Sequence, residues 1–155
     1  MKIMEDSFHL GIKALILNQE NELLLLKVNK ELLRGSKNDS YWDIPGGRIQ
    51  KGDTIESTIK REVKEETGLE IKEIQFYDMA ISNIRIPVGD TDVGLILAVY
   101  TCKCINNKER IKLSREHVDF GFFNITQSSK LLQVKYPKNF TKKVENLHNF
   151  FEQKN

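Results

Sequence analysis

The stretch Trp42–Leu69, WDIPGGRIQKGDTIESTIKREVKEETGL, determines how the rest of the chain is interpreted. A short apolar run leads into Pro45-Gly46-Gly47, a polar loop follows, and the remaining residues have the pattern of a helix that ends at Gly68. We expect Asp53 to be the N-cap of this helix, with Glu56 three residues later completing a capping box. The stretch therefore predicts a glycine turn followed by a well-defined helix.

Three glutamates of this helix, Glu62, Glu65 and Glu66, lie within five residues. On a helical wheel, Glu62 and Glu66 fall inside or beside the apolar stripe, and the lysines lie on the opposite face. The stripe consists of Ile55, Ile59 and Val63. A solvated acidic face is the ordinary explanation of such a charge run. However, a carboxylate directed toward the core is unfavourable unless it is paired or bound to a metal. The placement therefore favours a bound cation.

The ligand type indicates which cation this is. Three carboxylates without a cluster of histidines or cysteines favour a hard ion, Mg²⁺ or alternatively Mn²⁺, over zinc. Mg²⁺ held by a few carboxylates usually completes its coordination shell with water and substrate phosphates. The pattern therefore predicts chemistry on a phosphate ester or phosphoanhydride, in which water activated by the metal or by a carboxylate attacks phosphorus.

These residues resemble a known family motif, the Nudix box, which is a glycine, a glutamate after five residues, and REUxEExGU after seven more, where U is aliphatic. The matching positions are Gly47, Arg61, Glu62, Val63, Glu65, Glu66, Gly68 and Leu69. One position departs, because Asp53 stands where the family has glutamate. Trp42 and Pro45-Gly46 also resemble the usual residues before the box.

The resemblance implies an α+β fold, a Nudix-type αβα sandwich with a mixed central sheet between helices. It implies a pyrophosphohydrolase that acts on a nucleoside diphosphate linked to another group. Glu62, Glu65 and Glu66 would be the metal ligands, and Arg61 would orient a catalytic glutamate. The Gly46-Gly47 turn would let the backbone approach metal and phosphate. The shorter Asp53 makes the usual contact between that position and Arg61 uncertain.

Two residues outside the glutamate cluster are further candidates. Glu116 precedes a late strand, where many members of the family carry a similar Glu-His segment, so it is predicted to join the site as a catalytic carboxylate; the alternative is a solvated loop residue. Arg48 directly follows Gly47 and is predicted to meet a substrate phosphate, with a solvated arginine as the alternative. None of the histidines His9, His117 and His148 is predicted to be a ligand.

The remaining chain is predicted to form strands and one more helix. Expected strands are 8–17, 22–28, 40–44, one or two within 69–82, 93–103 and 118–125, and the first two should form a hairpin. An amphipathic helix is expected over 138–153. Residues 29–40, 83–92 and 106–115 are expected to be loops or connections. Cys102 and Cys104 are expected to be reduced and structural, with a redox or metal role as the alternative.

Composition excludes several classes of protein. The 155 residues are 39% hydrophobic and 30% charged, with a formal net charge of +2. We expect a single domain over 1–155, located in the cytoplasm, because no apolar run approaches the ~18 residues of a membrane span and no signal peptide is evident. The near-neutral charge gives no support for a nucleic-acid surface. Whether the chain is a monomer or a homodimer is not determined by the sequence.

Three functions remain open at this point. The first is hydrolysis of a small nucleotide substrate: a nucleoside triphosphate, a dinucleoside polyphosphate or a nucleotide sugar. The second is removal of pyrophosphate from RNA 5′ ends. The third is a non-catalytic module that senses nucleotides, although such modules tend to lose the carboxylates that this chain keeps, and no attached effector domain is evident. Specificity is expected to come from residues 29–40, 82–92 and 106–117, whose composition does not identify a base or sugar.

Overall fold

The computed structural model describes residues 4–33, 40–105 and 110–152. The described elements are, in chain order, β1 (Phe8–Ile16), β2 (Leu23–Val28), a 3-10 turn (Lys30–Leu32), β3 (Trp42–Asp43), β4 (Gly46–Arg48), α1 (Ile55–Thr67), β5 (Ile71–Ile81), β6 (Ile86–Val88), β7 (Thr91–Cys104), β8 (His117–Phe123), α2 (Ile125–Leu131), a second 3-10 turn (Leu132–Val134), α3 (Lys138–Glu145) and α4 (Leu147–Glu152).

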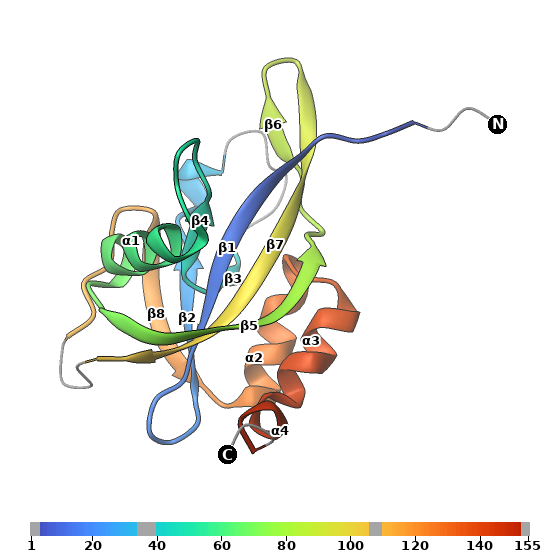
Figure 1. Cartoon of the computed structure of the whole chain (residues 1–155). Helices are drawn as coiled ribbons and strands as arrows, with labels where there is room; N and C mark the ends of the chain where they lie inside the picture. Colours follow the sequence, from blue (N-terminus) through green and yellow to red (C-terminus); the bar gives the residue numbers. More distant parts are fainter. Residues whose placement is uncertain (1–3, 34–39, 106–109, 153–155) are drawn as a thin grey trace.

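The strands form two sheets (Figure 1). One sheet has the order β4-β1-β7-β5, with β6 paired to β7, and is mixed because β1 and β7 run parallel while the other pairs are antiparallel. The second sheet has the order β3-β2-β8 and is antiparallel. The strand expected over 93–103 is β7, which lies between β1 and β5 in the sheet.

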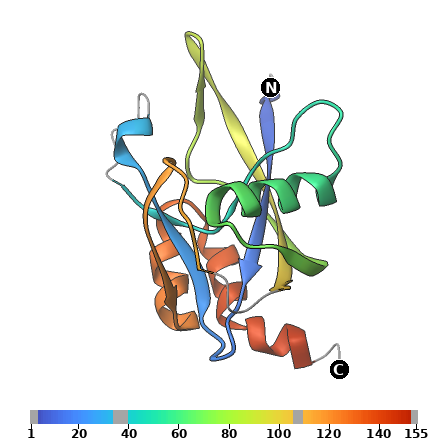
Figure 2. The same cartoon turned by 90° about the vertical axis from the view of Figure 1, so that its left-hand side faces the viewer.

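Helices cover the strands from two sides, as Figures 1 and 2 show. Alternate residues of β1 point to opposite sides: Ala14 and Ile16 join the cluster that contains Ile59 and Val63 of α1, whereas Leu15 joins the cluster that contains Phe140 of α3. This alternation is what a strand buried on both faces requires. The predicted αβα arrangement of an α+β protein is confirmed, with the strands divided between two sheets.

The predicted hairpin between the first two strands is wrong. β1 and β2 belong to different sheets and are joined near their turn only by the isolated bridge between Leu17 and Leu23. The physical reason is that both edges of β1 are already paired, one with β4 and the other with β7. The Asn18 side chain accepts the amide of Glu22 and stabilises the turn that carries the chain from one sheet to the other.

The C-terminal half also differs from the prediction. The strand expected over 118–125 begins at His117 and ends at Phe123, where Asn124 caps α2, a helix that the sequence analysis did not identify. The single helix expected over 138–153 is two helices separated at Asn146, and residues 153–155 lie outside the described part of the chain. The segment 83–92, expected to be a loop, contains β6.

Cys102 is buried and Cys104 is partly buried, and neither forms a disulfide, in agreement with the prediction of reduced cysteines. Among the described residues, no helix is both long and apolar enough to cross a membrane.

Candidate active site

The first turn of α1 is capped differently from the prediction. Thr54, not Asp53, is the N-cap: its hydroxyl accepts the Ser57 amide, and the Ser57 hydroxyl accepts the Thr54 amide. The expected role of Glu56 in a capping box is therefore also wrong, and its carboxylate accepts instead from Lys60 at 2.7 Å. Thr54 is an equally suitable capping residue, and its use releases the Asp53 side chain for other contacts.

Asp53 reaches Arg61 in spite of its shorter side chain. Its Oδ2 accepts from Arg61 Nη2 at 3.1 Å and from the Gln50 amide at 3.1 Å. The hydrogen bond from Arg61 lowers the pKa of Asp53 below its ordinary value. The same Arg61 nitrogen lies 3.5 Å from Glu62 Oε1. Arg61 therefore bridges Asp53 and Glu62, and the contact that the departure from the motif made uncertain is present.

The glycine turn packs closely against both β1 and α1. Gly46 has φ +150°, and a Cβ atom there would lie 2.1 Å from the Ile12 carbonyl oxygen. A Cβ atom on Gly47 would lie 2.4 Å from the carboxylate carbon of Glu62. The turn is fixed to β1 because the Ala14 amide donates to the Pro45 carbonyl at 2.8 Å. The absence of side chains at these two glycines is what allows the backbone to lie beside the Glu62 carboxylate.

The three glutamates of α1 have different environments. Glu66 is 2% exposed, Glu62 is partly buried and Glu65 is exposed. Burial raises the pKa of Glu66 to about 8; Lys13 opposes this rise, and Asp43, Glu116 and Glu62 add to it. Burial also raises the pKa of Glu62, with a contribution from Glu65. The helical wheel thus located the two inward carboxylates, Glu62 and Glu66, correctly, and Glu65 lies on the solvent-exposed side of the same helix.

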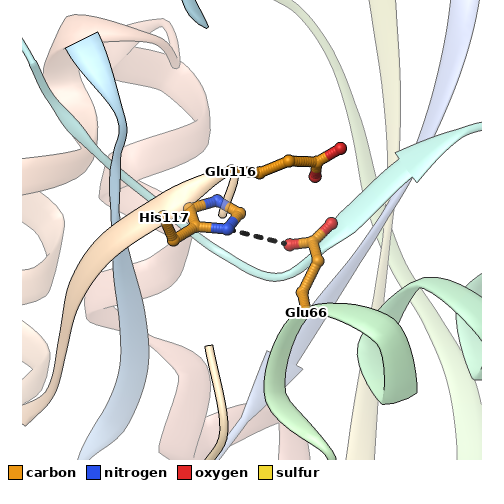
Figure 3. Close-up of side chains that lie close together, drawn as sticks. All are labelled: Glu66, Glu116 and His117. Atoms are coloured by element: carbon orange, nitrogen blue, oxygen red, sulfur yellow. Dashed lines mark ion pairs between the residues drawn. The ribbon is translucent and has the colours of Figure 1, made fainter. Parts of the chain in front are cut away.

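Glu116, in the turn that precedes β8, and His117, the first residue of β8, lie beside Glu66, as Figure 3 shows. Each of the three residues offers one ligand atom, and these atoms all lie within 4.8 Å of one another. The structure therefore brings the predicted Glu116 to the glutamates of α1. His117, which was not predicted to be a ligand, belongs to the same cluster. Burial lowers the pKa of His117 to about 4, with a smaller contribution from Lys13, so the ring is neutral near pH 7.

A divalent cation fits this donor set. Among the buried side-chain nitrogens and oxygens of the described residues, those without a hydrogen-bond partner are Glu66 Oε2 and His117 Nδ1, and both belong to the cluster. Unpaired buried polar atoms are rare in proteins and call for a physical explanation. A cation shared by these atoms would satisfy both, and it would also relieve the repulsion between the carboxylates of Glu62, Glu66 and Glu116.

A buried ion network lies behind the glycine turn. Asp43 accepts from Lys13 Nζ at 2.9 Å, from Lys135 Nζ at 2.6 Å and from the Tyr136 hydroxyl at 2.6 Å. Burial alone would raise the pKa of Asp43, but the two lysines hold it well below its usual range. Because Lys13 also donates to the Ile44 carbonyl at 3.3 Å, the network fixes the backbone just before the glycine turn. The sequence analysis missed these residues, although a lysine within the apolar segment 8–17 was a signal for a buried charge.

Arg48, predicted to bind substrate, is exposed on β4, and its Nη1 lies 3.0 Å from Nδ1 of His9 on β1. The described contacts therefore hold Arg48 beside the first strand and do not join it to the glutamates. A separate hollow of about 900 Å³ is lined by the β1–β2 turn, the ends of β5 and β7, and α4, including Cys104 and His148. It is not lined by any of the predicted site residues.

Comparison with known proteins identifies the family. Residues 7–144 match the NUDIX domain. The chain is 41% identical over 58 residues to a human 8-oxo-dGDP phosphatase, NUDT18, an alignment that covers 37% of this chain and 16% of that protein. It is 28% identical over 116 residues to an ADP-ribose pyrophosphatase of Methanocaldococcus jannaschii, which covers 75% of this chain and 62% of that protein. The alignments with these two relatives thus span less than two thirds of the relatives' own lengths.

A solved structure supports the same assignment. The MutT protein from Methanosarcina mazei Go1 superposes with a TM-score of 0.64 at 25% identity, over 95% of this chain and 97% of that chain. The domain match over residues 7–144 shows that the chain belongs to the NUDIX domain family, and the structural similarity and the geometry around Glu62 and Glu66 agree with it.

Proposed function

We propose that this chain is a metal-dependent hydrolase that cleaves the pyrophosphate linkage of a nucleoside diphosphate derivative. The observation that carries the proposal is the convergence of Glu66 with Glu116, in which a buried carboxylate keeps one oxygen without a hydrogen-bond partner, while the neighbouring Glu62 adds to the negative charge at Glu66. The names of the relatives, an 8-oxo-dGDP phosphatase and an ADP-ribose pyrophosphatase, support a substrate of this chemical class.

Glu62, Glu65 and Glu66 are proposed to hold a divalent cation, Mg²⁺ or Mn²⁺, with Glu116 joining them from the turn that precedes β8. The cation would supply charge neutralisation on the phosphates and polarisation of a phosphoryl oxygen. Arg61, itself held by Asp53, orients the Glu62 carboxylate. Because Gly46 and Gly47 carry no side chains, the backbone of the turn lies directly beside that carboxylate.

A residue that accepts a proton from the attacking water must reach solvent or substrate. Glu66 is fully buried and does not meet this requirement, whereas Glu62 is partly exposed and Glu116 is exposed. The raised pKa of Glu62, caused mainly by burial, brings it closer to neutral pH, where a general base is most effective. Glu62 and Glu116 are therefore the two candidates for the general base, and Glu66 serves as a ligand.

The test is release of phosphate or pyrophosphate across a substrate panel, in Mg²⁺ and in EDTA. The panel contains nucleoside triphosphates, 8-oxo-dGDP and 8-oxo-dGTP, ADP-ribose, nucleotide sugars, dinucleoside polyphosphates and triphosphorylated RNA. The proposal expects turnover of at least one small nucleotide in Mg²⁺ and none in EDTA. Nucleotide binding without turnover of any compound would support a sensing module instead, and turnover confined to the RNA would assign the chain to 5′-end processing.

A further inference from the structure

Two buried side chains of the candidate site face each other without forming a hydrogen bond (Figure 3). Nδ1 of His117 and Oε2 of Glu66 are 3.7 Å apart, their side chains are 8% and 3% exposed, and neither atom has a hydrogen-bond partner. A separation of 3.7 Å is too long for a hydrogen bond. Two ligands of one ion, each at about 2.1 Å from it, lie roughly 3.0–3.4 Å apart. The observed separation is therefore close to that of two ligands of a shared cation.

The backbone directs the His117 side chain into the site. β8 pairs with β2 so that Lys27 lies opposite Asp119 and Val28 lies opposite His117, which leaves Val118 as an extra residue in a bulge. Such bulges commonly redirect a side chain at functional sites. Asn29 reinforces the arrangement, because its amide donates to the Glu116 carbonyl at 2.8 Å. The position of the imidazole is thus determined by strand pairing and does not depend on a side-chain hydrogen bond at Nδ1.

The ring nitrogen that faces Glu66 is also available to a ligand. A histidine binds a metal through a ring nitrogen that carries no proton. Nδ1 of His117 is buried and has no hydrogen-bond partner. A cation shared with Glu66 would satisfy this nitrogen.

We propose that His117 is a metal ligand beside Glu66 and Glu116, and that it gives the site a preference for ions that accept imidazole, such as Co²⁺ and Zn²⁺, relative to Mg²⁺. This inference rests on the proposed function, because it adds a nitrogen ligand to the same carboxylate site. Imidazole favours first-row transition metals, whereas a site made only of carboxylates and water is suited to Mg²⁺. His117 therefore determines which metal the site selects.

The experiment compares binding of Co²⁺ and Mg²⁺ to the full chain after removal of metals with EDTA, by titration calorimetry without nucleotide. His117→Ala should weaken Co²⁺ binding by about tenfold or more and Mg²⁺ binding by less than about threefold. His148→Ala, an exposed histidine on α4, is the matched control and should leave both affinities unchanged. Equal losses for both ions, or no loss of Co²⁺ binding, would overturn the proposal.

A second measurement needs no variant and so does not depend on the stability of His117→Ala. In the unmodified chain, paramagnetic Co²⁺ should broaden the ring signals of His117 beyond detection in the NMR spectrum and leave those of His148 sharp. Ring signals of His117 that remain sharp in saturating Co²⁺ would show that the imidazole is not a metal ligand and would overturn the proposal. Co²⁺ binding through His117 without hydrolysis of any nucleotide would overturn the proposed function alone, and hydrolysis with His117-independent metal binding would overturn this inference alone.

Discussion

Replacing Gly47 with alanine should displace one carboxylate and leave the fold intact. The new Cβ atom would lie 2.4 Å from the carboxylate carbon of Glu62 and 2.5 Å from Oε2, whereas ordinary contacts begin at 3.4 Å. The Glu62 carboxylate must therefore move by about 1 Å, and a misplacement of this size can cost roughly 10²-fold in rate. The atoms that move belong to the end of a flexible side chain, so the free energy of unfolding should change by less than ~1 kcal/mol.

Gly46→Ala is the matched control, because the change is the same and the position is adjacent. Its Cβ atom would lie 2.1 Å from a backbone oxygen, that of Ile12, and φ is +150°, so the fold itself should be destabilised, by about 1–3 kcal/mol or more. The assays are kcat on the substrate that the panel identifies and urea denaturation monitored by Trp42 fluorescence. If Gly47→Ala keeps kcat within threefold of the unmodified chain, or if it unfolds as readily as Gly46→Ala, the account of this turn is refuted.

Three further predictions concern charged residues. Asp53→Ala should reduce kcat about 10–100-fold by freeing Arg61, while Asp53→Glu should retain activity in steady-state kinetics. Equal activity of the unmodified chain and both variants would contradict the role of Asp53 in holding Arg61. Asp43→Asn leaves Lys13 with an unpaired buried charge and should lower the free energy of unfolding, measured by urea denaturation, by about 3–5 kcal/mol. A loss below ~1 kcal/mol would argue against a stabilising role of the buried ion network around Asp43. In EDTA, the folded chain holds the Glu66 proton more tightly than the unfolded chain, since burial raises this pKa to about 8 from 4.5. As the pH rises from 4.5 to 8, the free energy of unfolding of the unmodified chain should therefore fall by more than ~1.4 kcal/mol relative to that of Glu66→Gln. A difference between the two proteins that does not change with pH would be inconsistent with a buried Glu66.

The helix α1 and its charged face could be predicted because their signals are local. The spacing of Ile59 and Val63 defines the buried face, and the positions of Glu62 and Glu66 on the same wheel follow from it. The N-cap was misassigned for a local reason as well. Asp53 and Thr54 are adjacent and both are good capping residues, and the choice between them depends on the contact of Asp53 with Arg61, which only the folded chain reveals.

The contribution of His117 could not be predicted in the same way. It is 51 positions from Glu66 in sequence, and it enters the site through the pairing of β8 with β2 and the bulge at Val118. Nothing in the local sequence specifies that pairing. The buried pair Lys13 and Asp43 was missed for a related reason, since charges that neutralise each other across two sheets have no periodic pattern along the chain.

Substrate specificity is expected to come from the three segments 29–40, 82–92 and 106–117. Two of the segments expected to carry it, 29–40 and 106–117, lie partly outside the described residues. Identification of the nucleotide therefore depends on the substrate panel.

The central claim is that the carboxylate cluster around Glu66 carries out hydrolysis. The most direct measurement is kcat of Glu66→Gln on the identified substrate in Mg²⁺, with Glu56→Gln as the matched control, because Glu56 lies on the same helix and its carboxylate is exposed. The account predicts a loss of about 10²-fold or more for Glu66→Gln, normal activity for Glu56→Gln, and a cooperative urea denaturation transition for each variant, which shows that both remain folded. Near-normal turnover by Glu66→Gln would contradict the account.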